Sequence, residues 1–228
     1  MKKIFIIMFL LFVSLLPANA IVIDCTKDGN VENYINKIGF TLLNANRIPY
    51  RTVFYYNSNS KVMNAYSSSR DMSITVYKKI VLIADNEDEL AAILAHEISH
   101  SVDSRQGLFR GYFTTWQYVL SPKKYELKAD KRAVDYMVNA GYNPLSLITV
   151  FTKVMAQQRY DIFSSHPLSS KRMMYVYEYI FNKYPAYLAD NKYKDNLYYQ
   201  NFLLTSEKNR KKFQNKIETN SKKKIKYE

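Results

Sequence analysis

His96, Glu97 and His100 form the pattern His-Glu-x-x-His. On a helix, residues four positions apart lie one turn apart on the same face, so both imidazoles can reach one metal ion. Glu97 lies one position round from the first histidine and can act on a water at the metal without binding the metal itself. For a chain of this length with three histidines, the expected number of chance matches to this pattern is roughly 0.002. It predicts one zinc ion per chain, with His96 and His100 as ligands and Glu97 as general base.

The residues before this pattern predict the helix that presents it. Asn86 suits the N-cap position, and Glu89 three positions later completes a capping box. An apolar stripe at helical spacing would bury one face of this helix, formed by Leu90, Ile93, Leu94 and Ile98. We therefore expect a buried helix that begins after Asn86 and carries both histidines.

A catalytic zinc ion with two histidine ligands needs a third protein ligand and an open position for water. A helix predicted to begin at Ser121-Pro122 offers Glu126, with Asp130 one turn later. Glu126 would be the third ligand, and Asp130 would accept the free N–H of a ligand imidazole. The charged residues around them fit a solvated helix face equally well, so the local pattern leaves both interpretations open.

The remaining patterns predict a mostly helical α+β fold with one small sheet before the metal-binding helix. Gly141 is expected to end the helix that begins at Pro122. Further helices are predicted over residues 30–46, 144–159, 168–184 and 198–204. Strands are predicted over Arg51–Tyr56, Lys61–Tyr66 and Ser73–Ala84, which are rich in β-branched and aromatic residues.

The first 20 residues have the parts of a secretory signal. Lys2-Lys3 precede an apolar run of 13 residues, Ile4 to Leu16, and Ala18-Asn19-Ala20 suits cleavage after Ala20. An uncleaved anchor is the alternative, but the run is short for a membrane span. At 228 residues and 47% hydrophobic composition, the rest can form one core. We expect a signal peptide over 1–20, one metallopeptidase domain over 21–204 and a basic, partly disordered tail over 205–228.

Cysteine content and charge bear on disulfide formation, on lipid attachment and on the partners of the C-terminal residues. Cys25 is the only cysteine, so no internal disulfide is possible, and Asp24 before it argues for a plain thiol rather than a lipid anchor. The formal charge is +13, and nine basic residues lie between Lys208 and Lys226. We favour a solvated extension there over contact with anionic lipid or another envelope surface, and nucleic acid is an unlikely partner for an exported protein.

Six motifs together resemble the HtpX and type-one CAAX prenyl protease family of gluzincin metallopeptidases, and exported members without membrane helices look closest. In chain order they are Asn64-Ala65-Tyr66, Asp88-Glu89-Leu90-Ala91-Ala92, His96-Glu97-x-x-His100, Glu126-x-x-Ala129-Asp130, Ala140-Gly141-Tyr142-Asn143-Pro144 and His166-Pro167-x-x-x-x-Arg172. The resemblance implies a zincin-like domain whose small sheet packs beside the metal-binding helix. It also implies that Glu126 is the third zinc ligand.

The resemblance also suggests roles for residues outside the metal-binding triad. His166 and Arg172 would donate to the oxyanion formed on the substrate, or His166 would approach the open zinc position and hold the enzyme idle. The plainer alternative is that His166 caps a helix and Arg172 is a surface charge. Asn64, Ala65 and Tyr66 would lie on an edge strand that pairs with extended substrate. The following residues 67–71 depart from the family's usual Pro and Gly.

These inferences lead to an exported, periplasmic or otherwise extracytoplasmic zinc endopeptidase acting on extended or misfolded envelope proteins. Two alternatives stay open. A catalytically idle zinc-binding chaperone or adaptor would keep the ligands, although a structural site needs no general base such as Glu97. A non-heme iron oxygenase also uses two histidines and a carboxylate, but Glu97 would have no role there.

Overall fold

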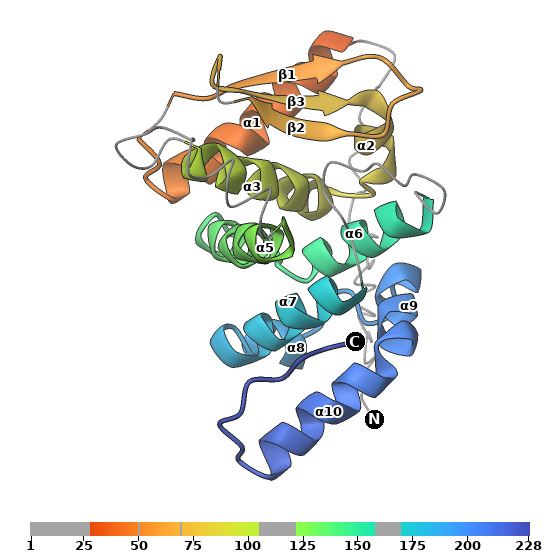
Figure 1. Cartoon of the computed structure of the whole chain (residues 1–228). Coiled ribbons are helices and arrows are strands. Elements are labelled where there is room, and N and C mark those ends of the chain that lie inside the picture. The colour runs from red at the N-terminus through yellow and green to blue at the C-terminus, as the bar shows by residue number, and fades with distance from the viewer. Residues whose placement is uncertain (1–27, 50, 69, 105–121, 158–169) are drawn as a thin grey trace, which may run out of the picture.

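The computed structural model describes residues 28–49, 51–68, 70–104, 122–157 and 170–228. In this part of the chain a small sheet lies at one end and helices follow in layers (Figure 1). The helix α3 (Glu87–Asp103) lies next to the sheet, and α5 (Pro122–Asn139) and α6 (Ser146–Gln157) form the next layer. The helix α7 (Ser170–Lys183) lies beyond them. The predicted mostly helical α+β architecture is confirmed at this level.

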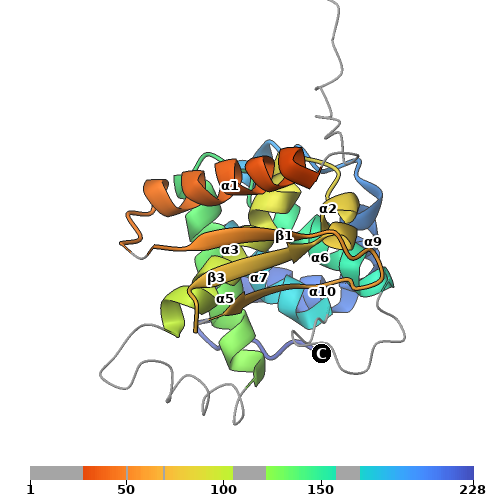
Figure 2. The same ribbon diagram turned by 90° about the horizontal axis from the view of Figure 1, so that it is seen from above.

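The sheet has three strands in the order β1-β3-β2. They are β1 (Val53–Asn57), β2 (Ala65–Ser68) and β3 (Ser73–Tyr77). β1 runs parallel to β3, and β2 runs antiparallel to it. The first two strands lie a few residues later than predicted. β2 pairs with β3 alone within the described residues, and it lies beside α3 (Figure 1). Seen from above, the helix α1 (Asp28–Ala45) runs alongside β1, on the side away from β3 (Figure 2).

The prediction of a strand over Ser73–Ala84 is wrong in its second half, because Lys78–Ile83 forms the helix α2. β-branched residues are common in strands, which made the segment look extended. Burial explains the difference, since Ile80, Val81 and Ile83 are buried whereas Leu82 is 56% exposed. A strand would place Leu82 on the same face as Ile80, whereas a helical turn separates them.

The helix α1 (Asp28–Ala45) approaches β1 closely at one glycine. A Cβ atom at Gly39 would lie inside the contact distance of three ring carbons of Phe54, a core residue of β1. We expect Gly39→Ala to lower the free energy of unfolding by about 1–3 kcal/mol, because overpacking forces the helix off the strand. Urea denaturation would measure this. Gly29→Ala is the matched control: nothing lies near its Cβ position, so it should be neutral or stabilising by up to about 1 kcal/mol.

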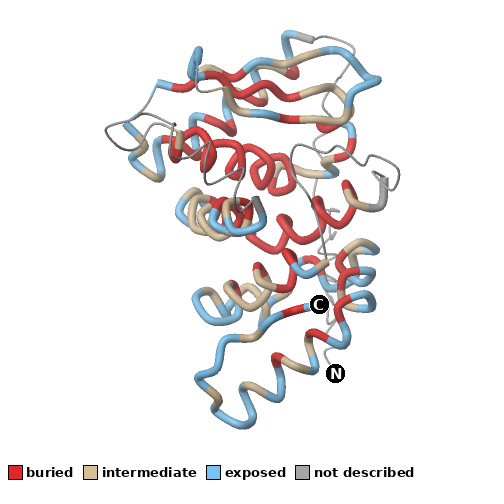
Figure 3. The backbone as a smooth tube through the Cα atoms, in the orientation of Figure 1, coloured by how far each residue is buried: buried red, intermediate tan, exposed pale blue. Residues whose placement is uncertain are grey.

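The helix α3 is buried along nearly its whole length, from Asp88 to Asp103 (Figure 3). Its predicted N-cap is confirmed, because the side chain of Asn86 accepts from the backbone N–H of Glu89 at 3.0 Å. The reciprocal bond of the capping box is shifted by one residue: Glu89 accepts from the backbone N–H of Asp85 at 2.9 Å. The start of the helix is therefore fixed by local hydrogen bonds.

A buried ion pair joins the start of α3 to α6. Nζ of Lys153 donates to Oε2 of Glu89 at 2.7 Å and to the backbone oxygen of Ile83 at 2.9 Å. The hydroxyl of Thr149 donates to the other oxygen of Glu89 at 2.8 Å. Because every one of these polar groups has a partner, the buried charges are compensated. The first turn of α3 is held against α6.

A second set of contacts joins the same turn to a later segment of the chain. The hydroxyl of Tyr193 donates to Oδ2 of Asp88 at 3.0 Å, and Nζ of Lys192 lies 2.7 Å from the same oxygen. The backbone N–H of Asn143 donates to Oδ1 of Asp88 at 3.1 Å. Residues more than 100 positions apart therefore meet at the beginning of α3.

The predicted end of α5 is confirmed at Gly141. This residue has φ +81°, a conformation that glycine adopts without a steric cost. The backbone N–H of Tyr142 then donates to the carbonyl of Met137 at 2.9 Å. This closing turn leads directly into α6, so the two helices that flank α3 keep a defined relative position.

The C-terminal residues differ from the expected partly disordered tail. After α8 (Ala186–Ala189) and α9 (Leu197–Thr205), residues Glu207–Glu218 form the helix α10. Phe213 of α10 is buried, and so is Tyr227, whose hydroxyl donates to Glu178 of α7 at 2.9 Å. A basic composition suggested a solvated extension, but these two aromatic residues supply the apolar contacts that order it.

Four lysines of α10 form ion pairs with glutamates. They are Lys208, Lys211, Lys212 and Lys216.

Some sequence predictions fall on other parts of the chain. The predicted signal peptide, Cys25 and the His166-Pro167 pair lie outside the described residues. No helix in the described ranges is both long enough and apolar enough to cross a membrane.

Candidate metal and catalytic site

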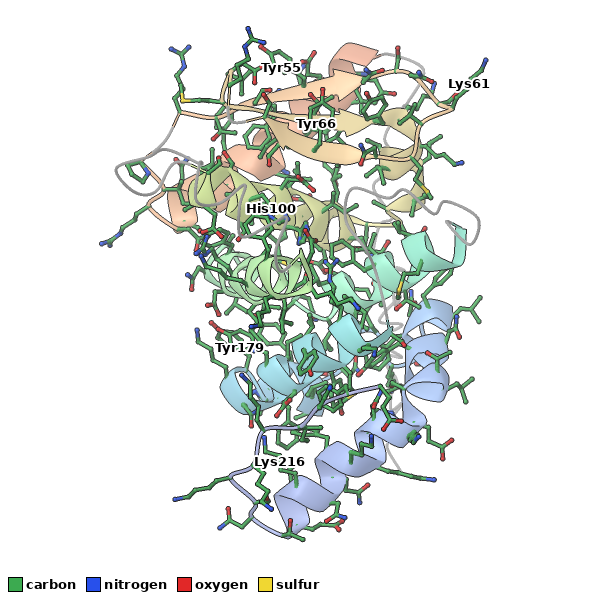
Figure 4. All side chains as sticks on the ribbon, in the orientation of Figure 1. Tyr55, Lys61, Tyr66, His100, Tyr179 and Lys216 are labelled. Atoms are coloured by element: carbon green, nitrogen blue, oxygen red, sulfur yellow. The ribbon has the colours of Figure 1, made fainter. Side chains whose placement is uncertain are left out.

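Both histidines of the predicted pair lie on α3, and their side chains are buried. His96 and His100 are 2% and 5% exposed, and their Nε2 atoms lie 3.0 Å apart. The two rings are nearly perpendicular, with centroids 4.6 Å apart. Figure 4 labels His100 at the boundary between α3 and α5. One helical turn thus brings two imidazole donors to a single point.

Glu126 of α5 supplies a third donor at the same point. Its carboxylate oxygens lie 3.3 Å from Nε2 of His96 and 3.4 Å from Nε2 of His100. Donor atoms bound to a tetrahedral zinc ion at about 2.0–2.1 Å lie roughly 3.3 Å from one another. The three residues therefore fit one small divalent metal ion. Glu126 is fully buried, which excludes the solvated helix face considered for it.

Asp130 lies one turn after Glu126 and stands behind His96. Its Oδ1 is 3.0 Å from Nδ1 of His96, and the carboxylate is fully buried. A carboxylate at this nitrogen keeps the proton on Nδ1 and leaves Nε2 as the donor toward the metal. The structure thus places Asp130 where the sequence analysis expected it.

Arg172 reaches the site from α7. Its Nε and Nη2 each donate to an oxygen of Asp130 at 2.7 Å, and Nη1 lies 3.1 Å from Oε2 of Glu126. The side chain is buried, so it is not the surface charge considered as an alternative. Arg172 joins the predicted cluster, with its guanidinium against the two carboxylates of α5.

The charges of the site act strongly on one another. Burial lowers the pKa of His96, but Asp130 and Glu126 outweigh burial and raise it to about 9. Burial and the neighbouring His96 lower the pKa of His100. Burial raises the pKa of Asp130, but Arg172 and His96 more than offset this and hold it below its usual value. Metal binding requires unprotonated Nε2 donors, so an incoming cation replaces a proton at this centre.

Glu97 follows His96 directly on α3 and is also buried. Its negative charge is one of the influences that counter burial at His100 and at Arg172. Glu97 therefore lies within electrostatic reach of the donor cluster without being one of the three grouped donors. This position suits a group that acts on a molecule at the metal.

Two aromatic residues that sequence reasoning missed lie against the histidines. The ring of Phe151, on α6, meets the His96 ring edge to face, with centroids 5.3 Å apart at 88°. The ring of Tyr125, next to Glu126, stacks on His100 at 4.7 Å and 28°. Phe151 belongs to an apolar helix face that resembles any core helix in sequence. Tyr125 carried a weak signal, because it directly precedes the third donor.

The predicted substrate-binding residues lie at the edge of the sheet that borders α3. Ala65 and Tyr66 belong to β2, and the backbone oxygen of Asn64 accepts from the N–H of Tyr77 at 3.1 Å. Ala65 is buried, whereas Tyr66 is 39% exposed and is labelled on the sheet in Figure 4. The structure therefore places this segment on an edge strand, whereas His166 lies outside the described residues.

Comparison with known families gives one match over this region. The profile of peptidase family M48 matches residues 30–109 and 103–180. Together the two matches cover more than half of the chain and include His96, Glu97, His100, Glu126 and Arg172. The helices α8, α9 and α10 lie after the matched region.

Individual relatives agree with this match. The chain is 26% identical over 191 residues to the beta-barrel assembly-enhancing protease of Yersinia pestis. It is 24% identical over 187 residues to the protein of the same name from Escherichia coli strain K12. Each alignment covers 64% of this chain and 38% of the relative. The chain therefore spans less than half the length of the relatives that it matches.

Proposed function

Because this chain belongs to peptidase family M48, we propose that it is a zinc-dependent endopeptidase that hydrolyses extended segments of protein substrates. The observation that carries the proposal is the convergence of His96, His100 and Glu126 with separations of 3.0–3.4 Å, beside the buried Glu97. Two imidazoles and one carboxylate form the three-ligand set of catalytic zinc sites. The layout of α3 beside a small sheet also suits the zincin-like domain that the sequence predicted.

The reaction assigns each residue a task. When bound, zinc supplies a Lewis acid that polarises the scissile carbonyl and lowers the pKa of water. A carboxylate oxygen of Glu97 takes a proton from the attacking water and later returns it to the nitrogen of the leaving amine. The water oxygen forms the new bond to carbon, and the C–N bond breaks. Asp130 holds the proton on Nδ1 of His96 throughout.

His166 keeps its predicted place in this proposal. His166 donates to the developing oxyanion, or it occupies the open ligand position and holds the enzyme idle. The nearest described residues of that segment begin at Ser170, which starts α7 and leads to Arg172. The role assigned to His166 rests on the family resemblance of the His-Pro motif.

Support for an extended substrate comes from the edge strand β2. An edge strand offers unpaired main-chain groups to which another extended chain can add. Asn64, Ala65 and Tyr66 lie on or beside this strand, next to the helix that carries the metal ligands. Substrate recognition through main-chain groups accepts many sequences, which suits misfolded or unassembled proteins.

We place this activity outside the cytoplasm, on proteins of the cell envelope. The signal-like residues 1–20 support export. The names of the relatives associate those proteins with the assembly of β-barrels. Contact of the basic C-terminal residues with an anionic envelope surface remains part of the proposal, although α10 uses several of its lysines in ion pairs.

Metal removal tests the proposal directly. We expect the mature protein to cleave an unfolded, casein-like substrate, and a chelator to abolish cleavage because the three donors then hold no Lewis acid. Adding zinc back in slight excess should restore the activity. Peptide release and bound zinc would be measured on the same samples. Stoichiometric zinc with no cleavage of any unfolded substrate would contradict the proposal and favour an idle binding protein.

A further inference from the structure

Among the described residues, each nitrogen of the Arg172 guanidinium contacts an acidic side chain. Nε and Nη2 engage both oxygens of Asp130, and Nη1 contacts Oε2 of Glu126. Asp130 in turn contacts Nδ1 of His96. One side chain from α7 thus touches a metal donor of α5 directly and reaches a donor of α3 through a single carboxylate.

Phe151 connects the same groups from another direction. Its ring lies 5.3 Å from the His96 ring, and Cζ of Arg172 lies 5.6 Å from the centre of the Phe151 ring. A cation close to an aromatic ring in a dry environment is held by the negative face of that ring. The Phe151 ring therefore contacts both the His96 ring and the Arg172 guanidinium. These two contacts restrict the rotation of the His96 and Arg172 side chains.

We infer that Arg172 and Phe151 are positioning residues, which fix the metal donors before the ion binds. The inference rests on the proposed function, because it concerns the same metal site. Arg172 holds the carboxylates of Glu126 and Asp130 in one orientation. Phe151 holds the His96 ring and the guanidinium in register. The donor set is then assembled from α3, α5, α6 and α7 rather than from the two ligand-bearing helices alone.

The geometry separates this role from the oxyanion role expected for Arg172 from the family resemblance. A guanidinium that stabilises an oxyanion must direct N–H groups at the substrate. Here all three nitrogens lie 2.7–3.1 Å from carboxylate oxygens of Asp130 and Glu126. These contacts place the guanidinium against the donor residues, so we expect its effect to appear in metal affinity.

The first test replaces Arg172 with lysine and measures zinc affinity by competition with a chromophoric chelator. Lysine keeps the charge but lacks the planar fork that spans Asp130 and Glu126. We expect zinc affinity to fall by about 10–100-fold, the usual effect of removing an outer-sphere partner. Turnover per bound zinc, measured at saturating zinc, should stay within roughly tenfold of the wild type, because the chemical groups remain.

The second test uses Phe151→Leu, which retains an apolar side chain and loses the ring. We expect zinc affinity to fall by about three- to thirtyfold. This is the fold-change that corresponds to losing the free energy of one buried cation–aromatic contact. Phe213→Leu is the matched control. Phe213 is a buried aromatic residue of α10 with edge contacts to Tyr177 and Phe181, far along the chain from the donors. It should lower thermal stability without changing zinc affinity.

A double-mutant cycle checks the route through Asp130. If Arg172 acts on His96 through this carboxylate, Arg172→Lys combined with Asp130→Asn should cost clearly less affinity than the sum of the single changes. Wild-type zinc affinity in Arg172→Lys, with turnover per bound zinc reduced by about 10²–10³-fold, would overturn the inference and return Arg172 to the oxyanion. Zinc affinity is read without substrate, so absence of peptidase activity alone would count only against the proposed function.

Discussion

Replacing Glu97 with glutamine is expected to lower turnover by about 10²–10⁴-fold while leaving the zinc content unchanged. Glutamine has nearly the same shape as glutamate, but its amide cannot take a proton from water. Glu97 lies beside His96 and outside the group of three metal donors, so the ligand set is intact in this variant. Casein digestion together with zinc analysis by mass spectrometry would measure both quantities on one preparation.

The chain offers a matched control for this substitution on the same helix. Glu89 is also a buried glutamate of α3, but its carboxylate contacts Lys153 and Thr149 in the first turn of the helix, two turns before Glu97. Glu89→Gln should lower stability, because the buried lysine loses part of its compensation. Turnover per folded molecule should be unaffected. A Glu97→Gln protein that still cleaves at the wild-type rate would remove Glu97 from the mechanism.

Replacing His96 with alanine is expected to abolish both metal binding and turnover. His96 supplies one of three donors, and its contact with Asp130 is lost at the same time. The loss of zinc affinity should exceed the roughly 10–100-fold that outer contacts contribute. Zinc retained after gel filtration and the rate of peptide release would report the two effects.

Asn209→Ala is a suitable control for the loss of a buried polar side chain. Asn209 lies on α10 and donates to the backbone oxygen of Glu228 at 2.9 Å. This variant should keep its zinc and its activity per folded molecule while unfolding at a lower temperature. Full zinc occupancy in folded His96→Ala would show that the ion binds elsewhere in the chain.

The parts of the site that could be predicted from the sequence are those encoded locally. Asn86 caps α3, and the spacing of His96 and His100 alone places both rings on one face of it. Gly141 ends α5 because only a short-range backbone requirement is involved. Such features depend on residues within one or two helical turns, where periodicity and capping rules apply.

The contacts between distant elements could not be predicted in this way. Arg172 was singled out by its motif, but which oxygens its guanidinium meets depends on how α7 packs on α5. Phe151 carried no signal at all, because an apolar residue in an apolar helix looks the same beside a metal site as in any core. The helix α2 was missed since burial by neighbouring elements overrode the strand preference of its β-branched residues.

The contacts of Asp88 with Lys192 and Tyr193 limit where the chain can be truncated without losing contacts of α3. The family match ends at residue 180, yet these two later residues hold the first turn of the metal-binding helix. A fragment cut at the end of the match would lose both side-chain partners of Oδ2 of Asp88 and would keep the contact of Oδ1 with the backbone of Asn143. The contacts that order α3 therefore extend beyond the matched residues, and we expect a fragment that ends at residue 180 to unfold more easily than the whole chain.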